Sequence, residues 1–302
     1  MASKRIDYVG IGFCSNDYLS VLPSIPYDSK VQMTEHLVQG GGPAATSTVA
    51  AARLGLTAGF LGTVGDDDPG KRIIRDFEAE GVTTSSMVIR PGETSPIAYC
   101  WIEESTGKRC VAWTRGTLAE LDPATELDLS LVRQAKMLHT DGHQTQAAIA
   151  AGKAAKEAGV LFNYDAGTIR PGIEELVKLA DILITSEEFA RRYTGIDDLD
   201  KAIFKLAENG SRVCGITMGD QGSMMLDNGN IIRCPAFSIK AIDTTGAGDV
   251  YHTAFGVRYL ETQDLMECMR FASAVSALKC LKLGGRTGIP NRQQVEDFLR
   301  TH

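Results

Sequence analysis

The sequence has no long apolar segment. No run approaches the roughly 18–20 residues with which an α-helix crosses a bilayer. Near the N-terminus, Lys4 and Arg5 precede a short apolar stretch that Asp7 interrupts, and no small-residue cleavage pattern follows. This stretch is predicted to be a first strand and not a signal peptide. We therefore expect a cytoplasmic protein that has no membrane partner.

Cysteine patterns typical of metal sites or disulfide frameworks are also missing. The seven cysteines form no C-x-x-C pair, and their number is odd. A structural zinc site requires clustered Cys and His ligands, which the sequence does not show. We expect reduced and mostly buried thiols, as in a cytosolic protein. Residues that would hold any other metal ion are not evident.

An excess of positive charge is lacking as well. There are 31 basic and 38 acidic side chains, giving a net charge of −7. Proteins that neutralise nucleic-acid phosphates usually carry the opposite sign, so a nucleic-acid partner is not expected. An apolar content of 43% and a charged content of 23% are typical of globular proteins. Without a repeat or a low-complexity linker, residues 1–302 are predicted to form one domain.

Apolar stretches alternate with helical patterns along most of the chain. Strands are predicted at residues 6–12, 58–64, 136–140, 160–164, 181–185 and 212–217. Helices are predicted at residues 44–54, 69–80, 145–158, 247–260, 265–281 and 292–301, with one more that starts after Ser186 as its N-cap. This rhythm predicts an α/β fold with a mostly parallel central sheet flanked by helices in three layers.

A few segments depart from the rhythm. Residues 31–38, 97–103 and 109–114 have strand patterns, and the last two are predicted to be joined by a turn at residues 105–107. They predict a small β-sheet projecting from the main domain, formed by approximately residues 14–38 and 95–115. Residues 222–226 and 230–234 flank an Asn-Gly turn, a strong hairpin signal.

The segment DTTGAGD at residues 243–249, followed by an apolar helix, carries most of the chemical information. Its two glycines allow a tight turn, and the first N–H groups of the next helix form an anion site. A carboxylate at Asp249 lies beside that site. Phosphoryl transfer needs this combination of donors for the phosphate and a base for the attacking hydroxyl. The alternative is an ordinary glycine-rich loop with an acidic helix start.

Two further glycine-rich segments are weaker signals when each is taken alone. GGGPAATSTVAAARLG at residues 40–55 lets the main chain approach a ligand, but the same pattern serves close helix packing. GTVGDDDPG at residues 62–70 reads as an acidic loop before a helix. Asp141 and His143 follow a strand and could either contact a ligand or cap the next helix. Arg115 and Arg170 could each meet an anionic group or lie solvated at the surface.

Together these segments resemble the ribokinase or PfkB family of carbohydrate kinases. The GG segment and G-x-V-G-D-D-x-x-G are similar to the N-terminal signature of that family, and DTTGAGD is similar to its C-terminal signature. TMGDQG at residues 217–222 resembles its nucleotide loop. The order and spacing match over essentially the whole chain. The resemblance implies a ribokinase-like fold, a lid formed by the small sheet, and an ATP-dependent phosphotransferase acting on a hydroxyl of a sugar, preferably a primary one.

The resemblance also implies roles for individual residues. Asp249 falls on the catalytic base, and the anion hole falls on Gly246, Ala247 and Gly248. The nucleotide site is expected at Thr217, Gly219, Gly222, Ser186, Glu187 and Ser273. Sugar contacts are expected from Asp17, Gly41, Gly42, Thr46 and His143. The family motif N-x-x-E, which is linked to magnesium and phosphate, is replaced here by Ser186-Glu187-Glu188-Phe189. Both signature positions differ, so the way magnesium is positioned is left open, and Glu187 or Glu188 could act on it through water.

Within the family, the pattern is most similar to that of the sulfofructose kinases. VAWTRG at residues 111–116 lacks the Asn of that group, however, and His143 stands at its Arg position. The alternatives are a nucleoside kinase of the same fold, for which Tyr99, Trp101 or Trp113 could supply an aromatic platform, and a non-catalytic sensor of sugars or nucleotides. ATP and Mg²⁺ are the implied cofactors, K⁺ is a further candidate, and a homodimer through the lid is expected.

Overall fold

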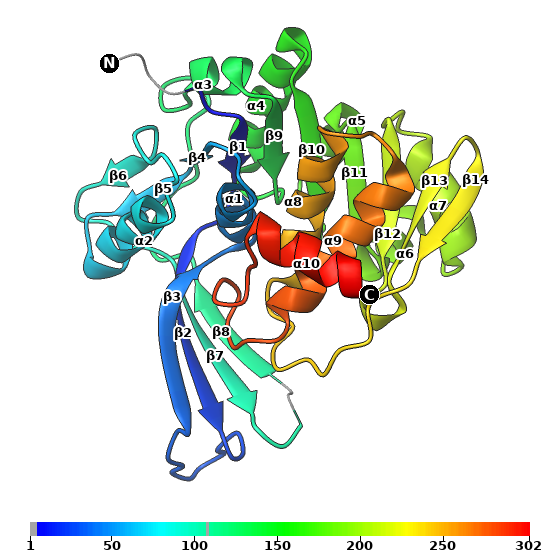
Figure 1. Ribbon diagram of the computed structural model, residues 1–302. Helices are drawn as coiled ribbons and strands as arrows, with labels where there is room; N and C mark the ends of the chain where they lie inside the picture. Colours follow the sequence, from blue (N-terminus) through cyan, green and yellow to red (C-terminus); the bar gives the residue numbers. More distant parts are fainter. Residues whose placement is uncertain (1–4, 107–108) are drawn as a thin grey trace.

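The strands predicted from the sequence form one eight-stranded sheet in the computed structural model, which describes residues 5–106 and 109–302 (Figure 1). Neighbouring strands from β12 to β4 are parallel, whereas β13 and β14 form an antiparallel hairpin at one edge. In spatial order the strands are β14 (Asn230–Cys234), β13 (Ser223–Asp227), β12 (Val213–Thr217), β11 (Ile182–Ser186), β10 (Leu161–Ala166), β9 (Met137–Thr140), β1 (Tyr8–Ile11) and β4 (Ala58–Leu61).

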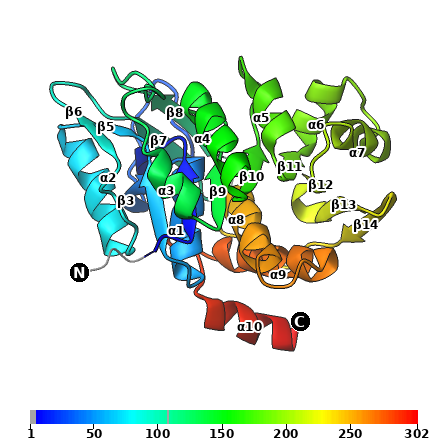
Figure 2. The same ribbon diagram turned by 90° about the horizontal axis from the view of Figure 1, so that it is seen from above.

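Helices cover both faces of this sheet, so the predicted three layers are confirmed (Figure 2). One face is covered by α1 (Pro43–Arg53), α8 (Ala247–Tyr259) and α9 (Leu265–Lys279), with α10 (Arg292–Thr301) packed behind α9. The other face carries α3 (Leu129–Gln134), α4 (Thr145–Ala158), α5 (Ile173–Leu179), α6 (Glu187–Thr194) and α7 (Leu199–Ala207). α2 (Asp68–Ala79) lies beside the edge near β4.

Burial on both faces explains the composition of the central strands. All four residues of β1 and of β9 are buried, which suits the near-continuous apolar runs of parallel strands. α1 approaches the sheet so closely that a Cβ atom on Gly10 would lie 2.0 Å from Oγ1 of Thr48. The alanine-rich sequence of α1 is therefore a packing requirement, and it brings the N-terminus of α1 close to the carboxyl edge of the sheet.

A separate four-stranded sheet, here called the flap sheet, projects from the main body (Figure 1). In spatial order it contains β3 (Glu35–Gly41), β2 (Ser15–Leu22), β7 (Ile97–Glu103) and β8 (Arg109–Thr114). The sequence did not predict β2, because its first residues are polar. The strand predicted at residues 31–38 is shifted toward the glycines, since Ser15 pairs with Gly41 in an antiparallel ladder. Of the turn predicted at residues 105–107, Gly107 lies outside the described residues.

The single strand predicted at residues 58–64 is interrupted at Gly62. β4 ends at Leu61, and β5 (Thr63–Gly65) pairs instead with β6 (Val88–Arg90) in a small parallel sheet. The chain thereby leaves the central sheet just where the flap sheet begins. Within the described part of the chain, no helix is long and apolar enough to cross a membrane.

Candidate active site

The first turn of α8 forms a cluster of main-chain donors at the carboxyl edge of the sheet. Gly246 is the N-cap with φ of 77°, and no side chain caps this end of the helix. A Cβ atom on Gly246 would approach the carbonyl oxygen of Gly285 to 3.1 Å, whereas one on Gly248 would meet nothing within 4 Å. Gly246 therefore provides the turn, and Gly248 leaves open space above the helix terminus for an anion.

The loop before α8 is held from below by two charged groups. The Asp243 carboxylate accepts hydrogen bonds from the N–H groups of Thr245 at 2.9 Å and Gly284 at 2.8 Å. Lys279 is fully buried, and its Nζ donates to the carbonyl oxygen of Asp243 at 2.8 Å. Burial raises the pKa of Asp243, but the Thr245 N–H and the Lys279 ammonium outweigh it and hold this pKa below its usual value. The loop thus keeps its shape without a ligand.

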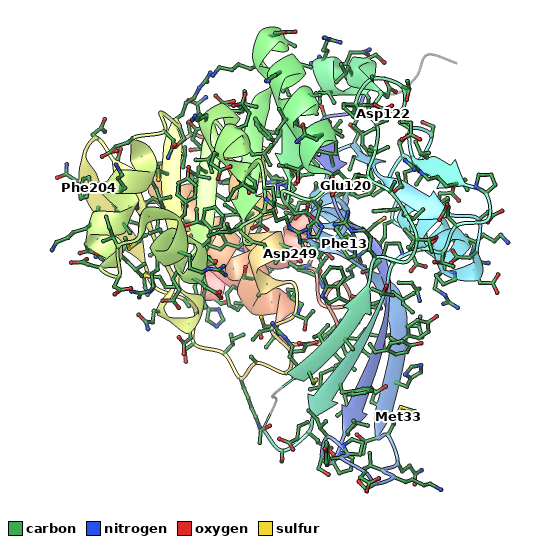
Figure 3. The ribbon with its side chains drawn as sticks, turned by 180° about the vertical axis from the view of Figure 1, so that it is seen from behind. Phe13, Met33, Glu120, Asp122, Phe204 and Asp249 are labelled. Carbon is green, nitrogen blue, oxygen red and sulfur yellow. The ribbon has the colours of Figure 1, made fainter. Side chains whose placement is uncertain are left out.

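Asp249 is the third residue of α8 and lies at the junction of the main body and the flap sheet (Figure 3). Burial, followed by the nearby Asp165 carboxylate, raises the pKa of Asp249 to about 7. Asp165, at the end of β10, has Oδ1 2.8 Å from Nδ1 of His252, one turn further along α8. Asp249 is therefore a carboxylate whose proton affinity suits general-base chemistry near neutral pH.

A cleft of about 520 Å³ opens on one side of the α8 terminus. Four of the residues expected at the nucleotide site line this cleft: Thr217, Gly219, Gly222 and Ser273. Two of the residues expected at the anion hole, Ala247 and Gly248, line it as well. A Cβ atom on Gly222 would come 2.1 Å from the carbonyl oxygen of Cys234, so this loop can follow its path only with glycine there. The volume is within the range of about 300–1,000 Å³ that is usual for small-molecule sites.

Ser186 and Glu187 are not part of the cleft lining. The Ser186 hydroxyl accepts a hydrogen bond from the Phe189 N–H at 3.1 Å and so caps α6, as the sequence indicated. Glu187 is exposed and forms an ion pair with Arg191 at 3.4 Å. β11 and β12 nevertheless place Ser186 next to Thr217. Among residues 5–106 and 109–302, no group of three or more potential ligands could hold a metal ion by itself.

On the other side of Asp249, β2 and β3 bring together three of the residues expected at the sugar. A Cβ atom on Gly41 would lie 1.9 Å from a carboxylate oxygen of Asp17, and Gly42 has φ of 91°. Burial raises the pKa of Asp17, although the Ser15 hydroxyl and Arg286 counteract it. Both glycines are therefore required by close approach. Thr46 is buried one turn into α1.

Asp141 connects the loops that surround this part of the site. Its carboxylate accepts hydrogen bonds from the N–H groups of Phe13 and Ala44, both at 3.0 Å, and of His143 at 2.8 Å. Burial raises the pKa of Asp141 to about 6, against the effect of these donors. The sequence left open whether Asp141 contacts a ligand or caps the next helix. Asp141 does not cap α4, because no side chain caps that helix at Gln144; its carboxylate instead joins the ends of β1 and β9 to the start of α1.

The flap sheet contacts the main body at two places around the site. Arg109 of β8 donates from Nη1 to the hydroxyls of Thr244 at 3.1 Å and Thr245 at 3.4 Å. The ring of Trp113, also on β8, packs edge-on against Phe13 with centroids 5.6 Å apart. The flap sheet therefore reaches both the loop before α8 and the loop after β1.

This chain combines a glycine-rich anion site, an adjacent carboxylate of raised pKa, a cleft and a projecting sheet. The model of the pfkB family carbohydrate kinases matches residues 6–292. The chain belongs to this family.

Similar proteins agree with this assignment over their full length. A ribokinase from Haemophilus influenzae is 27% identical, with 91% of this chain and 94% of that protein covered. A nucleoside kinase from Methanothermobacter thermautotrophicus is 26% identical, with 96% and 94% covered. The structure of Arabidopsis thaliana ribokinase complexed with ribose and ATP superimposes with a TM-score of 0.84, at 25% identity, covering 98% of this chain and 99% of that one.

Three residues around the site of this family member were missed by sequence reasoning. Arg109 lies in a predicted strand, and only the folded chain brings it to the loop before α8. Lys279 could have been noticed as the one charged residue in the stretch ASAVSALKCL. Arg286, in GGRTGIP, is buried and donates to the carbonyl oxygen of Gly41 at 3.0 Å.

Proposed function

We propose that this carbohydrate kinase transfers the γ-phosphoryl group of ATP to a hydroxyl, preferably a primary one, of a sugar or sugar derivative. The main support is the position of Asp249. It directly follows Gly248, which lines the cleft, and its carbonyl oxygen accepts a hydrogen bond at 3.1 Å from Ser47 of α1, the helix that begins after Gly41 and Gly42. A base placed there can accept the proton of a hydroxyl that attacks the terminal phosphate from the opposite side.

The chain itself would perform three tasks in this reaction. Thr217, Gly219, Gly222 and Ser273 line the cleft in which we place ATP. The N–H groups at the start of α8 would stabilise charge on the transferring group, because fixed donors do not need to reorganise, although that of Ala247 also donates to the carbonyl oxygen of Thr244 at 3.2 Å. Asp249 accepts the proton, and its pKa of about 7 makes this transfer more favourable than it would be for an ordinary aspartate.

The nucleotide cleft is compatible with magnesium that arrives together with ATP. Mg²⁺ usually keeps several waters and binds through substrate phosphates and one or two carboxylates, so it does not require a dedicated cage. When bound, it would neutralise phosphate charge. Glu187 could reach it through water only after leaving Arg191.

The flap sheet is proposed to act as a lid. Its contacts through Arg109 and Trp113 bring it over the loops that border Asp249. Closing this sheet over the sugar would exclude water, which otherwise competes with the sugar as the phosphoryl acceptor.

The same sheet is proposed to form a homodimer, since its outer face carries Tyr18, Tyr99 and Trp101, and the rings of the two tyrosines stack at 5.0 Å.

A nucleoside is the second candidate substrate. The pair formed by Phe13 and Trp113 borders the sugar side, and the Trp113 side chain is 54% exposed, so that it could stack on a base. A sensor without activity has less support, because binding alone does not require a base next to the anion site.

All seven cysteines are free, which supports a reducing, cytoplasmic environment for the protein.

A screen for ADP release, coupled to product detection, tests the proposed function. The panel contains aldoses, ketoses, sugar acids, phosphosugars and nucleosides, each with ATP and Mg²⁺. We expect ADP release that depends on at least one sugar and a phosphorylated product of matching mass. Release that depends only on nucleosides would favour the second candidate, and binding without any turnover would favour a sensor.

A further inference from the structure

Three basic side chains lie near one another beyond the sugar side of the site, which is formed by Asp17, Gly41 and Gly42. They are His143, which follows β9, Arg170, which follows β10, and Arg115, which follows β8. His143 and Arg115 line the same small cavity, together with Phe13 and Gln144. Nη2 of Arg170 contacts Nε2 of His143. Three segments that are distant in sequence thus converge on one place.

The contact with Arg170 determines which nitrogen of His143 carries the proton. A guanidinium can only donate, so Nε2 of His143 must accept, and the proton of the neutral ring is on Nδ1. Burial, followed by Arg170 and Arg115, lowers the pKa of His143 to about 3, so the ring is neutral at physiological pH. The side chain is only 8% exposed, and Nδ1 has no partner in the described part of the chain. His143 therefore presents an unpaired N–H.

Arg170 carries a positive charge that the protein does not balance. In the two described ranges, no carboxylate lies within the 4.0 Å of an ion pair with Arg170, and its buried Nε lacks a partner. Burial lowers the pKa of Arg170, and the Asp141 and Glu120 carboxylates are near enough to counteract this effect. The oxygens of Asp141 already accept three main-chain N–H groups, however, and Glu120 is paired with Arg115. The Tyr164 hydroxyl, close to Gly142, is also buried without a partner.

Unpaired donors beside an unbalanced cation are costly unless a ligand completes them. A structural arginine is normally satisfied by carboxylates or carbonyl oxygens, as Arg53 is by Glu80 and two carbonyl groups in this chain. The cluster of Arg170, His143 and Arg115 instead offers donors only. Its complement is a group that has only acceptors and a negative charge.

The cluster also lies on the appropriate side of the reaction centre. The cleft assigned to ATP is lined from β12, α8 and α9, whereas the cluster follows β8, β9 and β10. Phe13 connects it to the sugar side, because its ring is 4.9 Å from that of His143 and its N–H bonds Asp141. A sugar with its reacting hydroxyl at Asp249 would therefore direct its other end toward the cluster.

We propose that the substrate is a sugar with an anionic group (phosphate, sulfonate or carboxylate) at the end remote from the phosphorylated hydroxyl, and that Arg170, the Nδ1–H of His143 and Arg115 bind that group. The proposal rests on the kinase function proposed above. Arg115 belongs to the chain leaving the flap sheet and is paired with Glu120 at 2.8 Å. Binding of the anion would therefore also connect the substrate to the lid.

Matched pairs of substrates test the proposal. Each neutral ketose or aldose is compared with derivatives that carry a terminal phosphate, sulfonate or carboxylate, and kcat and KM are measured for wild type, Arg170→Gln and the surface control Arg133→Gln. We expect an anionic member to be preferred over its neutral counterpart. Arg170→Gln should raise KM for that member by about 10–100-fold, the value of a hydrogen bond to a charged group. The neutral sugar and the control should be unaffected.

The three anionic arms show which group fits. Equal or better turnover of neutral sugars by wild type, or an equal loss for both members in Arg170→Gln, would overturn the anionic substrate while leaving the kinase function intact. If no sugar is phosphorylated, the proposed function fails, and binding decides the remaining question. Calorimetry should then show binding of the anionic sugars to wild type that is lost in Arg170→Gln, and equal binding to both proteins would overturn the inference.

Discussion

At the scale of single residues, the environment of Asp249 is arranged for proton transfer and not for stability. A carboxylate that is buried next to Asp165 keeps its proton up to a pH of about 7. Above that pH it is charged in a place where charge is unfavourable. The ionised carboxylate is the form that the reaction needs, and it is also the form that destabilises the fold. Catalytic residues commonly have this property.

Asp249→Asn should remove turnover while the fold and ATP binding remain. General-base catalysis is typically worth about 10²–10⁴-fold in rate. In wild type, kcat/KM should fall as the pH decreases through about 7, because the base becomes protonated. The rate that remains in the variant should lack this limb. A variant that keeps more than roughly a tenth of wild-type kcat would contradict the role of a base.

The same variant should be more stable than wild type at pH 8. The pKa of Asp249 is higher in the folded state than its unfolded value of about 3.9, so the native state binds more protons between these values and stability decreases as the pH rises through this range. Asparagine does not take part in this loss. Thermal melts at pH 8 should place Asp249→Asn above wild type, with a smaller difference near pH 4, whereas the exposed control Asp227→Asn should change little.

Gly246 and Gly248 belong to the same motif, but glycine is needed for a different reason at each position. The sequence predicts that the two glycines together allow a tight turn. In the structure the positive φ belongs to Gly246, whereas Gly248 is helical with open space around it.

Gly248→Val should therefore lower kcat strongly without lowering stability. Its side chain would occupy the space above the α8 terminus and keep the phosphate away from the N–H donors there. Loss of the contact with one donor in such a site costs about 10²–10³-fold. Sugar binding measured by calorimetry should change little. Gly246→Val is the comparison, since it should lower the melting temperature. Near-normal turnover of Gly248→Val would mean that the phosphate is held elsewhere.

Lys279 supplies a buried positive charge directly below the loop before α8. Lys279→Met should lower kcat, because the Asp243 carbonyl oxygen and carboxylate would both lose this neighbour. Because the Lys279 ammonium already supplies a positive charge below this loop, we expect that the enzyme needs no K⁺. Wild-type rates should therefore be equal in potassium chloride and in tetramethylammonium chloride. The exposed Lys282→Met is the control. Rates that depend on K⁺ in wild type would show that a separate cation is needed.

At the scale of elements, the flap sheet is the part that connects substrate binding to the phosphate site. Its inner face packs Leu19, Ala98, Cys100 and Ile102 with Leu283, so the sheet has a small core of its own. Its contact with the loop before α8 depends largely on polar groups of Arg109. Such a contact can break and form again, as a lid requires.

Arg109→Ala should therefore raise KM for the sugar and increase ATP hydrolysis without sugar, because water would reach the terminal phosphate more easily. Both effects should be larger when the flap strands at residues 97–114 are deleted. Release of ADP and formation of sugar phosphate are measured in parallel, with Lys30→Ala in the β2–β3 connection as the control. Tight coupling in the truncated but folded protein would contradict the lid function.

At the scale of the whole molecule, the outer face of the flap sheet exposes aromatic side chains. Alternation along β7 directs Tyr99 and Trp101 away from the inner face, and their side chains are 45% and 39% exposed. Aromatic side chains gathered on one face of a sheet favour an interface. A second copy of this chain would present the same face.

Light scattering after size exclusion should give twice the monomer mass for wild type. Trp101→Glu should shift the protein toward monomer, because a charge would be buried in the interface. Phe204→Glu is the matched control, since Phe204 is exposed on α7, far from the flap sheet (Figure 3). A monomeric wild type, or an unchanged mass for Trp101→Glu at low concentration, would contradict the dimer.

The sequence by itself determined the features that depend on neighbouring residues. The parallel strands, the helices, the cap at Ser186 and the turn before Asp249 follow from apolar periodicity, hydrogen bonds within a few residues and the freedom of glycine. These interactions are local, so their pattern is written in consecutive residues. The family signature added which residues belong together at the site.

Only the tertiary structure decided which distant groups meet. β2 was missed, because its pairing with β3 and β7 depends on partners elsewhere in the chain. Only in the folded chain does Asp141 accept hydrogen bonds from three loops, and only there does Lys279 bond the loop before α8. The contact between Arg170 and His143 also requires folding. The pKa of Asp249 depends on burial and on Asp165, and both arise from packing. Burial and through-space charge have no signature in neighbouring residues, so no local pattern could reveal them.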